Sequence, residues 1–220
     1  MVWRFWQREL EALGWQVLAI DLRGHGAGQP ADLAVTRMRD YADDVAAAAE
    51  QCPSKPILIG WSMGGLVAML VAAWGLAAAC VGLAPSAPAL REDQAMPLRE
   101  GVFGSAEYGI TSPDPAQQPA MPDLDLEERA IALGSLALES RLARDERKRG
   151  IVIRELPCPL LIVTAEWEAE RQRCTYTELR LPAEYHTVEA CSHWGLVLNR
   201  RALAGLVPMV ARWMAQATGA

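Results

Sequence analysis

The sequence has no excess of basic charge. It contains 21 lysine and arginine residues against 27 aspartate and glutamate residues, for a net charge of −6. The one basic cluster, between Arg141 and Arg149, is interleaved with Asp145 and Glu146, a pattern typical of a solvated helix face. Because nucleic-acid binding requires a basic patch or stripe, we expect no nucleic-acid partner.

The cysteines lack the patterns of metal sites and disulfide frameworks. The sequence has 5 cysteines, an odd number, and their positions (52, 80, 158, 174 and 191) show no paired metal-ligand spacing. Cys80 and Cys158 lie in apolar, strand-like contexts, which favours reduced thiols in a cytoplasmic protein. The N-terminus also lacks the basic and then apolar pattern of a signal peptide. We therefore predict a cytoplasmic protein without metal or cofactor.

One long stretch, from Ile57 to Leu90, has no charged residue. Its length alone would suggest a membrane span. However, the stretch begins with a strand-like run and a sharp turn, and Gly75 and Pro85 divide the rest. A buried helix and a central parallel strand also read as continuously apolar. We therefore expect no membrane span.

Helical and strand-like segments alternate along most of the chain. Apolar residues at helical spacing, or in short runs, predict these elements: helices at 3–13 (ended by Gly14), 38–49, 66–74 and 203–214, the last with Pro208 in its first turn or at a kink, and strands at 15–20, 56–59, 80–84, 160–164 and 185–188. Such alternation predicts an α/β fold, with a mostly parallel sheet covered by helices on both faces. Ligands of such sheets bind beyond the carboxyl ends of the strands.

The alternation breaks at about Arg91. Residues 96–122 are rich in proline, glycine and serine and show no clear periodicity, whereas residues 124–149 are helical in pattern. We interpret residues 91–150 as a cap or lid inserted over the core, and residues 1–90 and 151–220 as the core itself.

The most informative motif is Gly60-Trp61-Ser62-Met63-Gly64-Gly65, which follows the apolar run Pro56-Ile57-Leu58-Ile59. A serine on a sharp turn from strand to helix stands clear of the backbone. We expect Gly60 and Gly64 to relieve crowding at that turn. The free N–H groups of the helix N-terminus favour a developing oxyanion. A glycine-rich turn that merely contains a serine is the alternative.

A serine nucleophile needs a base, and the sequence has 3 histidines. His193 lies in a predicted loop between the last strand and the last helix, after the serine in the chain, and we favour it as the base. His186 lies within a strand pattern and is interpreted as structural. His25 is a loop residue with a structural role, although its loop could border the cavity.

The acid that orients the histidine is less well defined by the residues. Glu166, Glu168 and Glu170 follow the strand at 160–164, where a carboxylate at a strand's carboxyl end could serve. At least one of them belongs to a solvated acidic loop.

These motifs together resemble those of the α/β-hydrolase superfamily, and particularly of its small esterase-like members. The matching segments occur in the family order: Asp21-Leu22-Arg23-Gly24-His25-Gly26, Gly60 to Gly65, Thr164-Ala165-Glu166-Trp167-Glu168 and Cys191-Ser192-His193-Trp194. The resemblance implies Ser62 as nucleophile, His193 as general base and the backbone N–H of Met63 as an oxyanion donor. It also implies Glu168 as the acid in place of the usual aspartate, with Glu166 or another carboxylate as alternatives.

The resemblance is weakest at the N-terminus. Family members have further strands there, and a His-Gly loop that supplies a second oxyanion donor, before a segment like Trp3-Arg4-Phe5-Trp6. The missing third family strand would lie between the strands that end at Asp21 and Gly60. We expect a truncation of a longer protein, and the alternative is that the remaining strands pair directly.

The sequence thus predicts a serine hydrolase that cleaves a small-molecule carboxylic ester or thioester through an acyl-enzyme. Trp61, the insertion and the loops of His25 and His193 should line an apolar substrate cavity. A cofactor-free carbon–carbon hydrolase or lyase on the same site is one alternative. A truncated or inactive hydrolase-like binding domain is the other.

Overall fold

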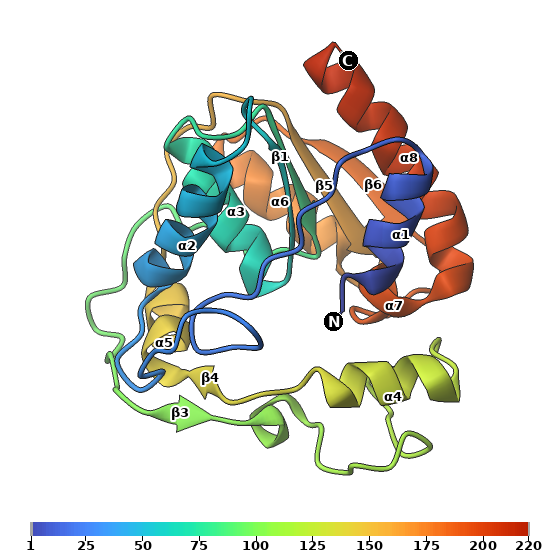
Figure 1. Ribbon diagram of the computed structural model, residues 1–220. Coiled ribbons are helices and arrows are strands. Elements are labelled where there is room, and N and C mark those ends of the chain that lie inside the picture. The colour runs from blue at the N-terminus through green and yellow to red at the C-terminus, as the bar shows by residue number, and fades with distance from the viewer. Residues whose placement is uncertain (1, 220) are drawn as a thin grey trace.

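The structure is a computed structural model that describes residues 2–219 (Figure 1). Its elements are, in chain order, α1 (Arg4–Ala12), α2 (Met38–Glu50), β1 (Ile57–Trp61), α3 (Met63–Ala73), β2 (Ala79–Leu83), β3 (Val102–Phe103), a 3-10 turn (Ser105–Tyr108), α4 (Leu126–Gly134), β4 (Glu139–Ser140), α5 (Arg141–Arg149), β5 (Leu160–Ala165), α6 (Glu166–Leu179), β6 (Glu184–Val188), α7 (Gly195–Leu198) and α8 (Arg200–Thr218). No helix in this range is both long and apolar enough to cross a bilayer.

The main sheet is parallel, in the order β1-β2-β5-β6. Helices cover both of its faces, as the sequence predicts (Figure 1). Alternate residues of the buried strand β2 explain this arrangement: Val81 and Leu83 belong to the core cluster under α1, α7 and α8, whereas Cys80 belongs to the cluster under α2, α3 and α6. Because both faces of β2 are dry, all five of its residues are buried.

The predicted strand at 15–20 is wrong, because these residues form an irregular segment. A strand needs a hydrogen-bonding neighbour, and an apolar run does not supply one. In the part of the chain that the structure describes, β1 is an edge strand of the sheet, bonded to β2 alone. Between β1 and residues 14–20 lies a groove of about 930 Å³, here called the edge groove. The two segments therefore do not pair directly, which was the alternative considered for the N-terminal region.

Two other predictions about elements need correction, and one of two alternatives for Pro208 is ruled out. The helical pattern at 124–149 forms two helices, α4 and α5, because β4 interrupts it. The glutamates after β5 lie in the first turns of α6 rather than in a loop. Pro208 lies inside α8, beyond its first turn, so the alternative that it kinks the helix stays a prediction.

Residues 91–150 extend along one end of the main sheet (Figure 1). Their strands β3 and β4 pair with each other as a separate antiparallel ribbon. Several polar contacts fasten this segment to the rest of the chain. Two of them reach the loops of His193 and His25: Asp123 accepts hydrogen bonds from Asn199 and from the backbone of Ser192, and Glu139 pairs with His25.

Candidate active site

Ser62 occupies the turn between β1 and α3. Its φ of 54° and ψ of −123° lie outside the ordinary regions for a non-glycine residue, so the turn holds this residue in strained geometry. The Ser62 N–H donates to the Leu83 carbonyl at 3.0 Å, and the Ser62 carbonyl accepts from the Ser86 N–H at 2.9 Å. The end of β2 and the loop after it therefore hold the turn in place.

Two glycines permit this turn: Gly60, as the motif predicts, and Gly65 instead of Gly64. A Cβ at Gly60 would lie 2.2 Å from the Gly64 carbonyl oxygen, and one at Gly65 would lie 2.5 Å from Cβ of Pro85. A Cβ at Gly64 would meet no atom within 4 Å. Gly64 borders both the edge groove and the cavity beside Ser62, so its Cβ position opens into space. The expected steric role of Gly64 is therefore wrong.

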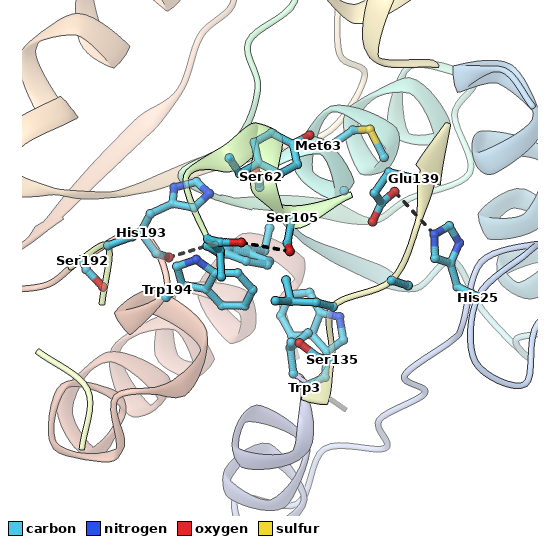
Figure 2. A pocket seen from close by; sticks show the side chains of 18 of the residues that line it. Trp3, His25, Ser62, Met63, Ser105, Ser135, Glu139, Ser192, His193 and Trp194 are labelled. Atoms are coloured by element: carbon cyan, nitrogen blue, oxygen red, sulfur yellow. Dashed lines mark hydrogen bonds and ion pairs between the residues drawn. The ribbon is translucent and has the colours of Figure 1, made fainter. Parts of the chain in front are cut away.

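His193 lies in the loop between β6 and α7. Trp61 holds this loop, because its Nε1–H donates to the His193 carbonyl at 2.9 Å and the two rings lie 5.0 Å apart. Figure 2 shows Ser62 and His193 on the same side of a cavity. Trp61, expected to contact substrate, therefore lines this cavity and also fixes the backbone of His193.

A carboxylate from the insertion also holds the histidine loop. Asp123 accepts from the Ser192 N–H and from Asn199 Nδ2, each at 3.1 Å. Burial would raise the pKa of Asp123, but the hydrogen bonds from Ser192 and Asn199 outweigh it and lower the pKa below the usual value. Sequence reasoning missed Asp123, because nothing in its local pattern links it to a loop 69 residues later.

Glu168 is the carboxylate that faces His193. Its Oε1 lies 3.7 Å from His193 Nδ1, and its side chain is only 3% exposed. Oε1 is buried without a hydrogen-bond partner among residues 2–219, while Oε2 lies 3.2 Å from Arg171 Nη2. Glu166 and Glu170 are exposed. Because a buried carboxylate oxygen needs a donor, the unpaired Oε1 is placed to accept from the His193 ring.

The other two histidines have different surroundings. His186 lies in β6 opposite Val163, and burial lowers its pKa. His25 lines the cavity but pairs with Glu139 at 3.4 Å, and its Nδ1 lies 3.0 Å from the Arg23 carbonyl. The hydrogen bond with Glu139 is the main cause that raises the pKa of His25.

Ser62, Met63, His193 and Trp61 all line one cavity of about 1410 Å³. Its other walls come from the N-terminal segment, the loop of His25 and the insertion, including Trp3, Tyr108, Ile110, Leu136 and Arg147. The N–H of Met63, at the first position of α3, has no partner within its own helix and is available to an anion. Within residues 2–219, no group of three or more His, Cys, Asp or Glu side chains is arranged to hold a metal ion.

Known proteins of similar structure carry the same fold. Polyneuridine aldehyde esterase is 15% identical, with a TM-score of 0.69 over 96% of this chain and 93% of that one. Tomato methylketone synthase I complexed with 2-tridecanone is 18% identical, with a TM-score of 0.70 over 98% and 93%. The thioesterase domain from the curacin biosynthetic pathway is 18% identical, with a TM-score of 0.57 over 94% and 86%.

At these identities the likeness establishes the fold alone. A comparison with curated protein sequences finds no match. The sequence itself gives the family, because residues 1–206 match the model of the Alpha/beta hydrolase family. The main parallel sheet, the serine turn after β1 and the histidine loop after β6 agree with that match, and the chain belongs to the Alpha/beta hydrolase family.

Proposed function

We propose that the protein is a serine hydrolase that cleaves a carboxylic ester or thioester through an acyl-enzyme, with Ser62, His193 and Glu168 as its triad. The observation that carries the proposal is the buried, unpaired Oε1 of Glu168, 3.7 Å from His193 Nδ1. An orienting acid must face the imidazole nitrogen that points away from the serine. The distance is longer than a hydrogen bond, as in many unliganded sites, and should shorten when substrate binds.

The chemistry assigns one task to each group. His193 Nε2 takes the proton of the Ser62 hydroxyl as the oxygen attacks the substrate carbonyl. The Met63 N–H donates to the oxyanion that forms. His193 then returns the proton to the leaving alcohol or thiol, and the acyl group stays on Ser62. Water then attacks this acyl-enzyme while His193 takes its proton, and His193 gives that proton to the leaving Ser62 oxygen as the acid is released.

We also propose that residues 91–150 act as a cap over this site. Tyr108, Ile110 and Leu136 form part of the cavity wall. Asp123 and Glu139 tie the insertion to the loops of His193 and His25. Movement of the insertion would therefore change the shape of the cavity and the position of the base together.

The comparisons support this reaction class only at the level of hydrolysis. The names of three similar structures describe a polyneuridine aldehyde esterase, an Arabidopsis methylesterase and a thioesterase domain. Their common chemistry is acyl transfer from an ester or thioester. The apolar side chains in the cavity wall, such as Trp61, Ile110 and Leu136, suit an apolar acyl or alcohol group.

Fluorophosphonate labelling followed by intact and peptide mass spectrometry tests the proposal. The wild-type chain should gain one adduct on Ser62, and the Ser62→Ala variant should gain none. Ser135 also lines the cavity, so Ser135→Ala is the matched control and should be labelled like the wild type. Ser62→Ala should also lower ester turnover by about four orders of magnitude.

The other outcomes separate the alternatives. A folded wild-type chain without an adduct would contradict the proposal and favour a non-enzymatic binding domain. Labelling of Ser62 without hydrolysis of any ester or thioester in a substrate panel would favour carbon–carbon hydrolysis or a lyase reaction at the same site.

A further inference from the structure

Arg147 brings a positive charge to the wall of the cavity. It lies on α5 of the insertion, is half-buried, and lines the same cavity as Ser62. Its Nη1 donates to the Ser86 hydroxyl at 3.0 Å, and the Ser86 N–H in turn donates to the Ser62 carbonyl at 2.9 Å. A single residue, Ser86, thus connects this guanidinium to the backbone of the proposed nucleophile.

The other arginines of α5 have carboxylate partners. Arg141 and Arg144 both pair with Glu107, and Arg149 pairs with Glu92. Arg147 alone among them has no carboxylate within 4.0 Å in the part of the chain that the structure describes. Because a partly desolvated cation without a counter-charge is unfavourable, this site should attract an anion.

The carboxylates that line the cavity are engaged elsewhere or lie at its rim. Glu139 pairs with His25, and Asp123 accepts from Ser192 and Asn199. Asp21 accepts from the Ala27 N–H at 2.9 Å, and Glu166 is exposed.

A tyrosine lies near the guanidinium. Tyr108 lines the same cavity, and the charge of Arg147 acts on its hydroxyl, although burial raises the pKa of Tyr108 overall. The Ser86 hydroxyl holds the guanidinium by a hydrogen bond, and neither Ser86 nor Tyr108 neutralises its charge. Its remaining N–H donors have the planar fork geometry that binds the two oxygens of a carboxylate.

We propose that Arg147 binds a free carboxylate on the substrate, so that the protein acts on esters that also carry a carboxylic acid, such as half-esters of dicarboxylic acids. The proposal rests on the proposed hydrolase function and specifies its substrate class. A carboxylate is favoured over a phosphate because one cation balances its single charge. The apolar side chains of Trp61, Ile110 and Leu136 in the same cavity would contact the carbon chain between the two ends.

Two series of substrates test this recognition. The first contains p-nitrophenyl half-esters from succinic to suberic acid, and the second contains the same esters with the free acid methylated. The readout is the ratio of kcat/KM for the acid to that for its neutral partner. The wild-type ratio should exceed the Arg147→Gln ratio by about 10- to 100-fold at the best chain length, because a charge-assisted bond is lost.

Arg149→Gln is the matched control on the same helix, since Arg149 pairs with Glu92 and does not line the cavity. Its ratio should equal that of the wild type. Arg147→Lys keeps the charge without the fork and should give an intermediate ratio. If Arg147 had a merely structural role, Arg147→Gln would lower kcat/KM for the acid and for its neutral partner by the same factor. The ratio would then stay unchanged, and this result would overturn the proposal.

A binding measurement separates this proposal from the proposed function. Calorimetry with the dicarboxylic acids should show binding to Ser62→Ala and about 10-fold or greater weakening in Ser62→Ala/Arg147→Gln. Binding of this kind without any ester hydrolysis would refute the hydrolase function and keep the carboxylate site. Hydrolysis that depends on Ser62 but shows equal ratios in wild type and Arg147→Gln would keep the hydrolase function and refute the carboxylate site. Stronger binding of an alkylphosphonate than of the dicarboxylates would overturn the choice of ligand.

Discussion

The substitution Glu168→Gln tests the proposed triad most directly. Gln keeps the shape of the side chain but removes the charge 3.7 Å from His193 Nδ1. At this separation and an effective dielectric constant of about 20, a carboxylate stabilises an imidazolium by about 4 kcal/mol. His193 carries the proton in the transition state, so loss of this stabilisation should lower turnover about a thousandfold.

The assay compares kcat/KM for one reactive ester across three variants on α6. Glu170→Gln changes an exposed carboxylate on the same helix and should leave kcat/KM within about twofold of the wild type. Glu166→Gln changes an exposed carboxylate at the cavity and should cost little. A Glu168→Gln enzyme that keeps kcat/KM within tenfold of the wild type would refute the reasoning, and a larger loss in Glu166→Gln would assign the acid to Glu166.

Two further predictions concern stability. Gly60→Ala should lower the free energy of unfolding by about 3 kcal/mol, because its Cβ would lie 2.2 Å from the Gly64 carbonyl oxygen. Gly64→Ala should not lower it. Similar losses for the two variants in chemical denaturation would contradict this account of the turn. The pair of His25 and Glu139 raises the pKa of His25, so its stabilisation is full below about pH 6.5 and is lost as pH rises through the folded-state pKa. His25→Gln and Glu139→Gln should therefore destabilise the protein more at pH 6 than at pH 9 in urea titrations, and a pH-independent difference would exclude this linkage.

The parts of the fold and the site that could be predicted are those that follow from local sequence patterns. The pattern that predicts the serine turn lies in residues adjacent in the chain, and so do the patterns of the strand before it and the helix after it. Helix α6 escaped prediction because two of its four buried positions, Glu168, Gln172, Tyr176 and Leu179, are polar, so its core face has no apolar stripe.

Tertiary contacts account for what the sequence could not show. The run at 15–20 is apolar enough for a strand, yet strand formation depends on a neighbour elsewhere in the chain. Arg147 and Ser86 are 61 residues apart, and no local pattern predicts their contact. That no carboxylate among the described residues pairs with Arg147 is likewise visible only in three dimensions.

The position of β1 at the edge of the sheet has a consequence for the dynamics of the site. The turn that carries Ser62 is attached to a strand with one hydrogen-bonded neighbour, and the Ser62 N–H itself bonds to that neighbour at Leu83. Edge strands open at a lower free energy than central strands, by local fluctuation rather than by global unfolding. Each such opening would displace the proposed nucleophile from the proposed triad while the helices stay packed. The fraction of molecules with an intact site would then depend on the local stability of one strand edge.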